Sequence, residues 1–231
     1  AKKEASCRMT HLEACNGRTW DVWIHAWTIR GLLAAAKAGV HPEMALDAAE
    51  KACDLVARTI VEKSAGFIKL GNHQGLSAAI VLDALAEAAH DLKRPDLAGA
   101  AMTVLDQLEL SGVHAVSGPR NGLDASQLGT GKAYQIIWLL LGMVKLARAI
   151  SSQSLLDAAA YWWQNIHDHH LTPFGGPWGG MAGHHEVFNP RGFFSPEGFV
   201  ETCSTATWIS LSRELFLQTG DPKYASACET S

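Results

Sequence analysis

The chain has 231 residues, of which 48% are hydrophobic and 18% charged, and this composition predicts one globular domain. Its net charge of −4 gives no electrostatic reason to bind nucleic acid or an anionic membrane. No apolar run approaches the roughly 20 residues that span a bilayer, and no apolar stretch follows the N-terminus as in a signal peptide. Five scattered cysteines are an odd number without a disulfide framework, which favours a reducing, cytoplasmic compartment.

Apolar residues recur at steps of three and four along most of the chain, which is the period of amphipathic helices. Val22, Ala26 and Ile29 are an example. The pattern predicts helices over 22–33, 45–56, 76–89, 97–108, 133–149, 155–169 and 202–218, and another from Lys223. No run alternates with the period of two that a half-buried strand shows. The sequence therefore predicts an all-α protein.

Short polar turns alternate with long, glycine-rich links between these helices. The turns around Pro42, Pro95, Ser152 and Pro222 each precede an alanine-rich helix, which indicates stacked helical hairpins. The long links cover 64–75, 111–131 and 171–200. In an α/α toroid they emerge at one end, where we expect the functional site. Four hairpins are fewer than a closed six-hairpin barrel needs. We therefore expect residues 1–231 to form a single, partial domain, an arc of an (α/α)6 barrel.

The segment Glu201-Thr202-Cys203 opens one of the predicted helices. The positive end of the helix dipole stabilises a thiolate at Cys203, and Thr202 or Ser204 can cap the helix. The alternative for Cys203 is a small buried core residue, as unpaired cysteines often are. The alternative for Glu201 is a favourable charge at a helix N-terminus.

A second carboxylate, Glu186, lies in a glycine-rich loop beside His185 and Trp178. Partial burial against an aromatic side chain would suit it as a general acid, and a solvated loop carboxylate is the alternative. Trp20 and Trp178, flanked by glycine and polar residues, offer flat faces to a sugar ring. His73 opens a helix from another long link. The spacing of His167, His169 and His170 matches no zinc motif.

Several segments resemble the β-L-arabinofuranosidase-like enzymes of glycoside hydrolase family 127, also called domain of unknown function 1680. The most specific are the Glu201-Thr202-Cys203 start and the later Thr219-Gly220-Asp221-Pro222-Lys223-Tyr224-Ala225 turn. The loop from Leu171 to Gly176 with Glu186-Val187-Phe188 is similar to the family's acid/base loop. Earlier segments, from Trp20 to Trp23 and from Gly71 to Gly75, are similar too.

The resemblance implies an (α/α)6 barrel that hydrolyses L-arabinofuranosides or related sugars with retention. It implies that Glu186 is the general acid/base and that Glu201 and Cys203 are zinc ligands. It also implies a cysteine nucleophile and further zinc ligands in a segment absent from this chain, so that only two of four ligands are present. His73 is implied as a sugar-pocket residue, and we add His185, Trp20 and Trp178 as expected substrate contacts.

Three functional hypotheses stay open on the sequence. The first is a catalytic domain of that family, with a carbohydrate as substrate. The second is a non-catalytic helical module that binds a carbohydrate or a partner chain, because an open arc exposes apolar surface that the rest of the domain or a second copy would cover. The third is another toroid enzyme, a lyase or epimerase that uses His73 and Tyr134.

Overall fold

The computed structural model describes residues 20–180, 186–193 and 198–231, with the side chains of a few of these left out. The chain divides into two compact units, Ala1–Ser111 and Gly112–Ser231. Within the described residues almost all regular structure is helical, as the apolar periodicity predicts. The predicted all-α fold of helical hairpins is therefore confirmed, whereas the expectation of one partial domain stays a prediction.

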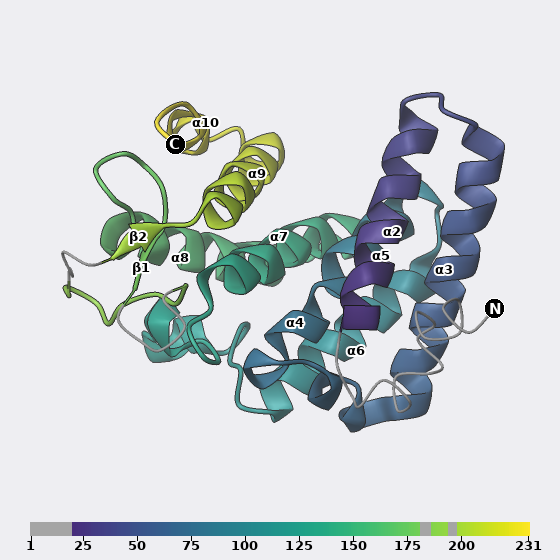
Figure 1. Cartoon of the computed structure of the whole chain (residues 1–231), viewed down its shortest axis with the longest axis horizontal. Coiled ribbons are helices and arrows are strands. Elements are labelled where there is room, and N and C mark those ends of the chain that lie inside the picture. Colours follow the sequence, from purple (N-terminus) through teal and green to yellow (C-terminus); the bar gives the residue numbers. More distant parts are fainter. Residues whose placement is uncertain (1–19, 181–185, 194–197) are drawn as a thin grey trace. The chain divides into compact units, whose positions relative to one another are not determined.

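In the first unit, α2 (Trp20–Lys37) and α3 (Pro42–Lys63) form one helical hairpin, and α5 (Val81–Asp91) and α6 (Pro95–Leu110) form another (Figure 1). Helix α2 packs against α5, and α3 packs against α6. A proline opens both α3 and α6, because the first helical turn does not use the N–H group that proline lacks. Both hairpins agree with the sequence analysis.

Short helical turns fill the link between these hairpins. They are η2 (Ser64–Gly66), η3 (Ile68–Leu70), η4 (His73–Gly75) and α4 (Leu76–Ala79). The helix predicted over 76–89 is interrupted once, between the end of α4 and the start of α5 at Val81.

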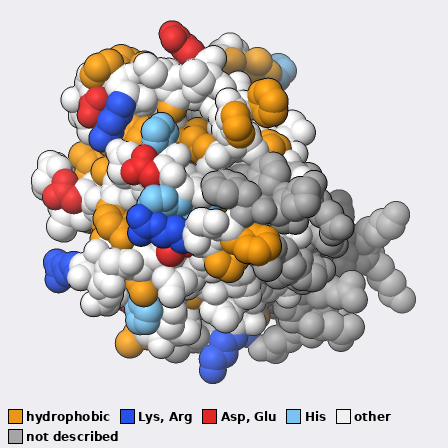
Figure 2. Space-filling model, turned by 90° about the vertical axis from the view of Figure 1, so that its left-hand side faces the viewer, with side chains coloured by type: hydrophobic (Ala, Val, Ile, Leu, Met, Phe, Trp, Pro, Cys, Tyr) orange, Lys and Arg blue, Asp and Glu red, His pale blue; other side chains and the backbone are white. Residues whose placement is uncertain are grey.

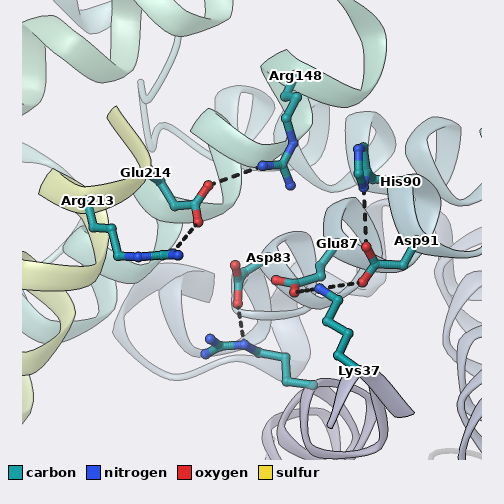
Figure 3. Close-up of polar contacts among 9 residues, drawn as sticks. Lys37, Asp83, Glu87, His90, Asp91, Arg148, Arg213 and Glu214 are labelled. Atoms are coloured by element: carbon teal, nitrogen blue, oxygen red, sulfur yellow. Dashed lines mark hydrogen bonds and ion pairs between the residues drawn. The ribbon is translucent and has the colours of Figure 1, made fainter. Parts of the chain in front are cut away.

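Ion pairs connect α2 to α5 across the first unit. Lys37 Nζ lies 2.6 Å from Glu87 Oε1 and 2.7 Å from Asp91 Oδ2. Arg30 Nε lies 3.0 Å from Oδ2 of Asp83, whose side chain is fully buried. Figure 3 shows Lys37 between the two carboxylates of α5. Removal of either partner of the Arg30–Asp83 pair would leave a charge in a poorly solvated place, which is costly.

In the second unit, α7 (Ala133–Ile150) packs against α8 (Gln153–His169) and α9 (Thr202–Thr219), and α10 (Pro222–Glu229) packs against α9. The carboxylate of Glu214 on α9 contacts two guanidinium groups, at 3.3 Å from Arg148 Nη1 and 3.1 Å from Arg213 Nη1 (Figure 3). Two short helical turns, η5 (Gly118–Asn121) and η6 (Ala125–Gln127), precede α7.

Stacked rings join α8 and α9, with Trp163 and Trp208 buried and His167 at the exposed end. The indole of Trp163 lies between the ring of His167, at 5.0 Å between centroids, and that of Trp208, at 5.1 Å. Its Nε1–H donates a hydrogen bond to Ser212 Oγ over 2.8 Å. The helical spacing of Trp208 predicts a core residue, and its complete burial confirms this.

Helix α7 is the one candidate membrane span among the described helices, with a mean hydropathy of 1.4 over 18 residues. The segment passes this test by length and composition alone, and Lys145 and Arg148 interrupt its apolar run. In addition, 78% of the helix is buried inside the protein, as in the core helix of a globular domain. Because α8 and α9 cover α7, its side chains are mostly apolar. A cytoplasmic location of the protein stays a prediction.

Two very short strands also lie in the second unit. Strand β1 (Trp178–Gly179) pairs antiparallel with β2 (Phe199–Val200), with Trp178 opposite Val200 and Gly179 opposite Phe199. The sequence analysis expected no strand. Two residues are too few for an alternating pattern to be visible. Figure 2 shows the side on which β1 and β2 lie in Figure 1, and hydrophobic side chains form small separate groups among polar ones on its described part.

Candidate functional site

Backbone pairing brings four segments of the second unit together. Beside the pair of β1 and β2, Gly179 also pairs antiparallel with Phe188, and Val187 pairs antiparallel with Lys132. Phe188 N–H donates to Gly131 O over 2.8 Å, and the N–H of Ala133 donates to the carbonyl before Val187 over 3.0 Å. The loop segment 186–188 therefore lies between β1 and the start of α7.

Close backbone approach explains the glycine at position 179. A Cβ atom there would lie 2.5 Å from the carbonyl oxygen of Val187, closer than such atoms ever come. Any side chain at this position would therefore push the loop segment away from β1. Gly131, on the other side of that segment, has a φ of +75°, which an L-residue adopts only with strain.

The pairing places a carboxylate beside a buried amine. Lys132 is the N-cap residue of α7 and is 8% exposed, and its ammonium forms an ion pair with Oε2 of Glu186. Burial lowers the pKa of Lys132, while the charges of Glu201 and Cys203 act in the opposite direction. The ammonium is thus coupled to three acidic groups from two separate segments.

Strand β2 leads directly into Glu201, the N-cap residue of α9. Its backbone is extended, with φ −85° and ψ 128°, and its carbonyl accepts from Thr205 N–H over 3.1 Å. Its side chain caps no backbone N–H group of the helix, and Oε2 accepts from Ser204 Oγ over 3.1 Å. The expectation that Thr202 or Ser204 caps α9 is wrong, because Glu201 already occupies the N-cap. Its carboxylate therefore bonds to a side chain of the first helical turn and not to the helix backbone.

The thiol of Cys203 is free and exposed in the first turn of α9. The alternative of a small buried core residue is therefore wrong for Cys203. The buried positions in the first two turns of α9 are instead taken by Ser204 and Thr207. An exposed thiol at a helix start is a setting in which cysteines act as ligands or nucleophiles.

A buried hydrogen-bonded pair, His170 and Asp124, packs against the loop that carries Glu186. His170 ends α8, is 2% exposed, and lies at 3.1 Å from both carboxylate oxygens of Asp124. Its ring packs on Phe188, at 4.8 Å between centroids. Asp124 also accepts from Ser126 N–H over 3.0 Å and so caps η6. The pair therefore holds both the turn before α7 and the loop that carries Glu186.

The structure brings together only some of the residues that the sequence analysis selected. Glu186 forms an ion pair with Lys132, and the charges of Glu201 and Cys203 raise the pKa of the same lysine. His185 and the side chains of Trp20 and Trp178 lie outside the described residues. His73 lies in η4 of the first unit, with a left-handed φ of 56°, and its role stays a prediction.

The sequence analysis missed Lys132, Asp124 and His170 as site residues. Lys132 follows a glycine-rich stretch and precedes a long apolar helix, and a charged residue at such a boundary is a usable signal. Its partner could not be found in this way, since the pairing joins distant segments.

The described donors do not form a zinc site by themselves. No group of three or more histidine, cysteine or carboxylate side chains converges within the described ranges. Glu201 and Cys203 offer one oxygen and one sulfur, whereas zinc sites use three or four protein ligands. The ammonium of Lys132 is also coupled to both donors and is itself a cation.

The chain matches the family described as "Beta-L-arabinofuranosidase, GH127 catalytic domain" over residues 10–231. Among curated proteins, none matches the sequence. A solved structure titled "Glycoside hydrolase" is similar with a TM-score of 0.70 and 17% identity, over 92% of this chain and 37% of that one.

Two further structures come from the same family. A GH127 β-arabinofuranosidase is similar with a TM-score of 0.51 and 16% identity, over 93% of this chain and 44% of that one. A GH127 β-L-arabinofuranosidase from Geobacillus stearothermophilus T6 has a TM-score of 0.53 and 14% identity, over 90% and 46%. The chain spans less than half the length of each of the three. Since the family match covers nearly every residue, the chain belongs to the GH127 β-L-arabinofuranosidase catalytic-domain family.

Proposed function

We propose that the chain carries the acid/base part of the active site of a retaining glycoside hydrolase that acts on L-arabinofuranosides or related sugars. One observation carries this assignment. The carboxylate of Glu186 forms an ion pair with Lys132, and the charges of Glu201 and Cys203 raise the pKa of that lysine, which supports a common site for the residues of the two family motifs. We further propose that the hairpins form an arc of an (α/α)6 barrel.

Glu186 is the general acid/base in this proposal. In the first step it donates a proton to the leaving oxygen while the bond from that oxygen to the anomeric carbon breaks and an enzyme nucleophile bonds to the carbon. In the second step water attacks the same carbon, the bond to the nucleophile breaks, and Glu186 accepts the proton of the water. The family resemblance assigns the nucleophile to a cysteine outside these 231 residues.

The remaining residues have binding roles. Glu201 and Cys203 are the two donors that this chain offers to a zinc ion, whose chemistry in a binding site is to stabilise thiolates. His73, His185, Trp20 and Trp178 are proposed sugar contacts. Tryptophan faces suit the apolar side of a sugar ring, and histidines hydrogen-bond its hydroxyl groups.

Replacement of the acid/base carboxylate tests the proposal. In the full-length protein, Glu186→Gln should lower turnover of an arabinofuranoside with an alkyl leaving group by about 10²–10⁴-fold, the usual contribution of general acid/base catalysis. Formation of the glycosyl-enzyme from an activated aryl arabinofuranoside should fall much less, because its leaving group needs little protonation.

Glu229→Gln is the matched control, since Glu229 is an exposed carboxylate at the end of α10 in the same unit. It should leave turnover unchanged. Equal activity of Glu186→Gln and the wild type on the alkyl substrate would refute the acid/base role. A protein that binds arabinofuranosides without cleaving them would favour the non-catalytic module instead.

A further inference from the structure

The buried Lys132 has no role in the reaction as described so far, although it contacts the proposed acid/base residue. Its ammonium forms an ion pair with Glu186 Oε2, and its side chain is 10% exposed against 38% for the glutamate. Burial on this scale restricts the lysine to few conformations, while the carboxylate that it contacts stays partly open to solvent and so to a substrate. Lys132 is therefore placed to hold the carboxylate in one orientation.

Backbone geometry fixes the two partners independently of their side chains. Lys132 pairs antiparallel with Val187, and the carbonyl of Glu186 accepts from Ala133 N–H over 3.0 Å. The two side chains thus extend from backbone segments that are already bonded to each other. A rigid pair of this kind orients a reacting group at little entropic cost when the substrate binds.

The charge of Lys132 favours the general-base role of Glu186 over its general-acid role. An ammonium in contact with a carboxylate favours its charged form, which accepts a proton. Acceptance of a proton from water belongs to the second step, in which the glycosyl-enzyme is hydrolysed. In the first step the same contact opposes protonation of Glu186 and gives no advantage. The effect of Lys132 should therefore be concentrated in the second step.

We propose that Lys132 is a positioning residue that holds Glu186 as an oriented carboxylate for hydrolysis of the glycosyl-enzyme. The inference rests on the proposed function of Glu186. In the step concerned, the water oxygen bonds to the anomeric carbon, the bond from that carbon to the enzyme nucleophile breaks, and the proton of the water passes to Glu186. In this role Lys132 acts through the carboxylate that it contacts.

Steady-state kinetics of Lys132→Met in the full-length protein test this role with an activated aryl arabinofuranoside. For such a substrate kcat/KM reports formation of the glycosyl-enzyme, and kcat reports its hydrolysis. We expect kcat to fall by about 10–100-fold, part of the usual range for general base catalysis. KM should fall in parallel, because the glycosyl-enzyme accumulates, and kcat/KM should stay within about 3-fold. A burst of released aryl alcohol should precede the steady state.

Two further variants separate charge from packing. Lys132→Arg keeps a positive charge and should retain kcat within about 10-fold of the wild type. Lys132→Gln keeps a polar side chain without the charge and should behave as Lys132→Met does, which also covers the case in which the methionine variant does not fold. In the double variant with Glu186→Gln, loss of Lys132 should add nothing further, because both changes remove one coupled function.

Lys145→Met is the matched control, because Lys145 is a second buried lysine on α7 and lies about 20 Å further along the helix. Its kcat and KM should match those of the wild type. Equal losses of kcat and kcat/KM in Lys132→Met, or failure of arginine to preserve kcat, would overturn the positioning role. An active Glu186→Gln variant would instead overturn the proposed function, so the two failures are distinguishable.

Discussion

His170 Nε2 lies 3.1 Å from each carboxylate oxygen of Asp124, and both side chains are buried behind the loop that carries Glu186. Nε2–H donates to the carboxylate, while the imidazole ring rests on Phe188. The Ala125 N–H group next to the aspartate donates to Asn165 Oδ1 over 2.8 Å. The loop that carries Glu186 therefore packs, through Phe188, on a buried polar pair.

This pair predicts a pH dependence of stability. Burial acts to raise the pKa of Asp124, but hydrogen bonds from His170 and Ser126 outweigh burial and hold that pKa well below its usual range. A carboxyl with a depressed folded-state pKa contributes stability above its unfolded value of about 3.9 and loses it as the pH falls towards the folded value. Between about pH 5 and pH 2 the free energy of unfolding should therefore fall more steeply in the wild type than in Asp124→Asn.

Urea denaturation at a series of pH values measures this difference. Asp157→Asn provides the control, because Asp157 is exposed on α8 and its change should leave the slope close to that of the wild type. Parallel pH profiles for wild type and Asp124→Asn would contradict the prediction.

The three cysteines in the described part of the chain, Cys53, Cys203 and Cys228, should react with iodoacetamide in a definite order. Cys203 is exposed, Cys228 is half-buried with a raised pKa, and Cys53 is fully buried. Burial, followed by the charge of Asp54, raises the pKa of Cys53 to about 12. Since the thiolate is the reactive form, Cys203 should be labelled first and Cys53 only after unfolding. Peptide mass mapping with a chelator present reads each site separately, and rapid labelling of Cys53 in the native protein would be the contrary result.

Two glycine replacements should have opposite effects. In Gly179→Ala the new Cβ meets the Val187 carbonyl at 2.5 Å, so β1 and the site loop must separate. We expect a loss of about 1–3 kcal/mol in the free energy of unfolding. Gly99→Ala, at an exposed position of α6 with open space around it, should instead gain about 0.5–1 kcal/mol from helix propensity. Thermal and urea unfolding measure both, and a neutral Gly179→Ala would show that the loop tolerates separation from β1.

Zinc should bind weakly to these 231 residues. Only two donors, Glu201 and Cys203, are assigned here, and their charges already interact with the ammonium of Lys132, whereas complete structural zinc sites reach about 10–16 kcal/mol. Calorimetric titration should give a Kd above roughly 1 μM, which corresponds to about 8 kcal/mol. Lys132→Met should bind zinc more tightly, because it removes the cation from the donors, and Cys203→Ala should bind it less tightly. Unchanged affinity in Cys203→Ala would exclude this thiol as a ligand.

Part of the site could be predicted because its signals are local. The start of α9 at Thr202 follows from the apolar period, and the exposed Cys203 is consistent with its place in the first helical turn. The capping residue was misassigned, since Thr202, Ser204 and Glu201 all stand at positions from which a polar side chain can reach the helix end. Backbone conformation alone decided that Glu201 is the N-cap.

The amino-acid sequence by itself determined the helices, the hairpins and the turns between them, because the helical period and the proline starts depend on residues a few positions apart. It also indicated Glu186, Glu201 and Cys203. Only the tertiary structure decided that Lys132 meets Glu186, since this contact depends on backbone pairing between distant segments. This pairing buries the ammonium and brings it against Glu186. A contact between distant segments cannot be predicted from a local sequence pattern.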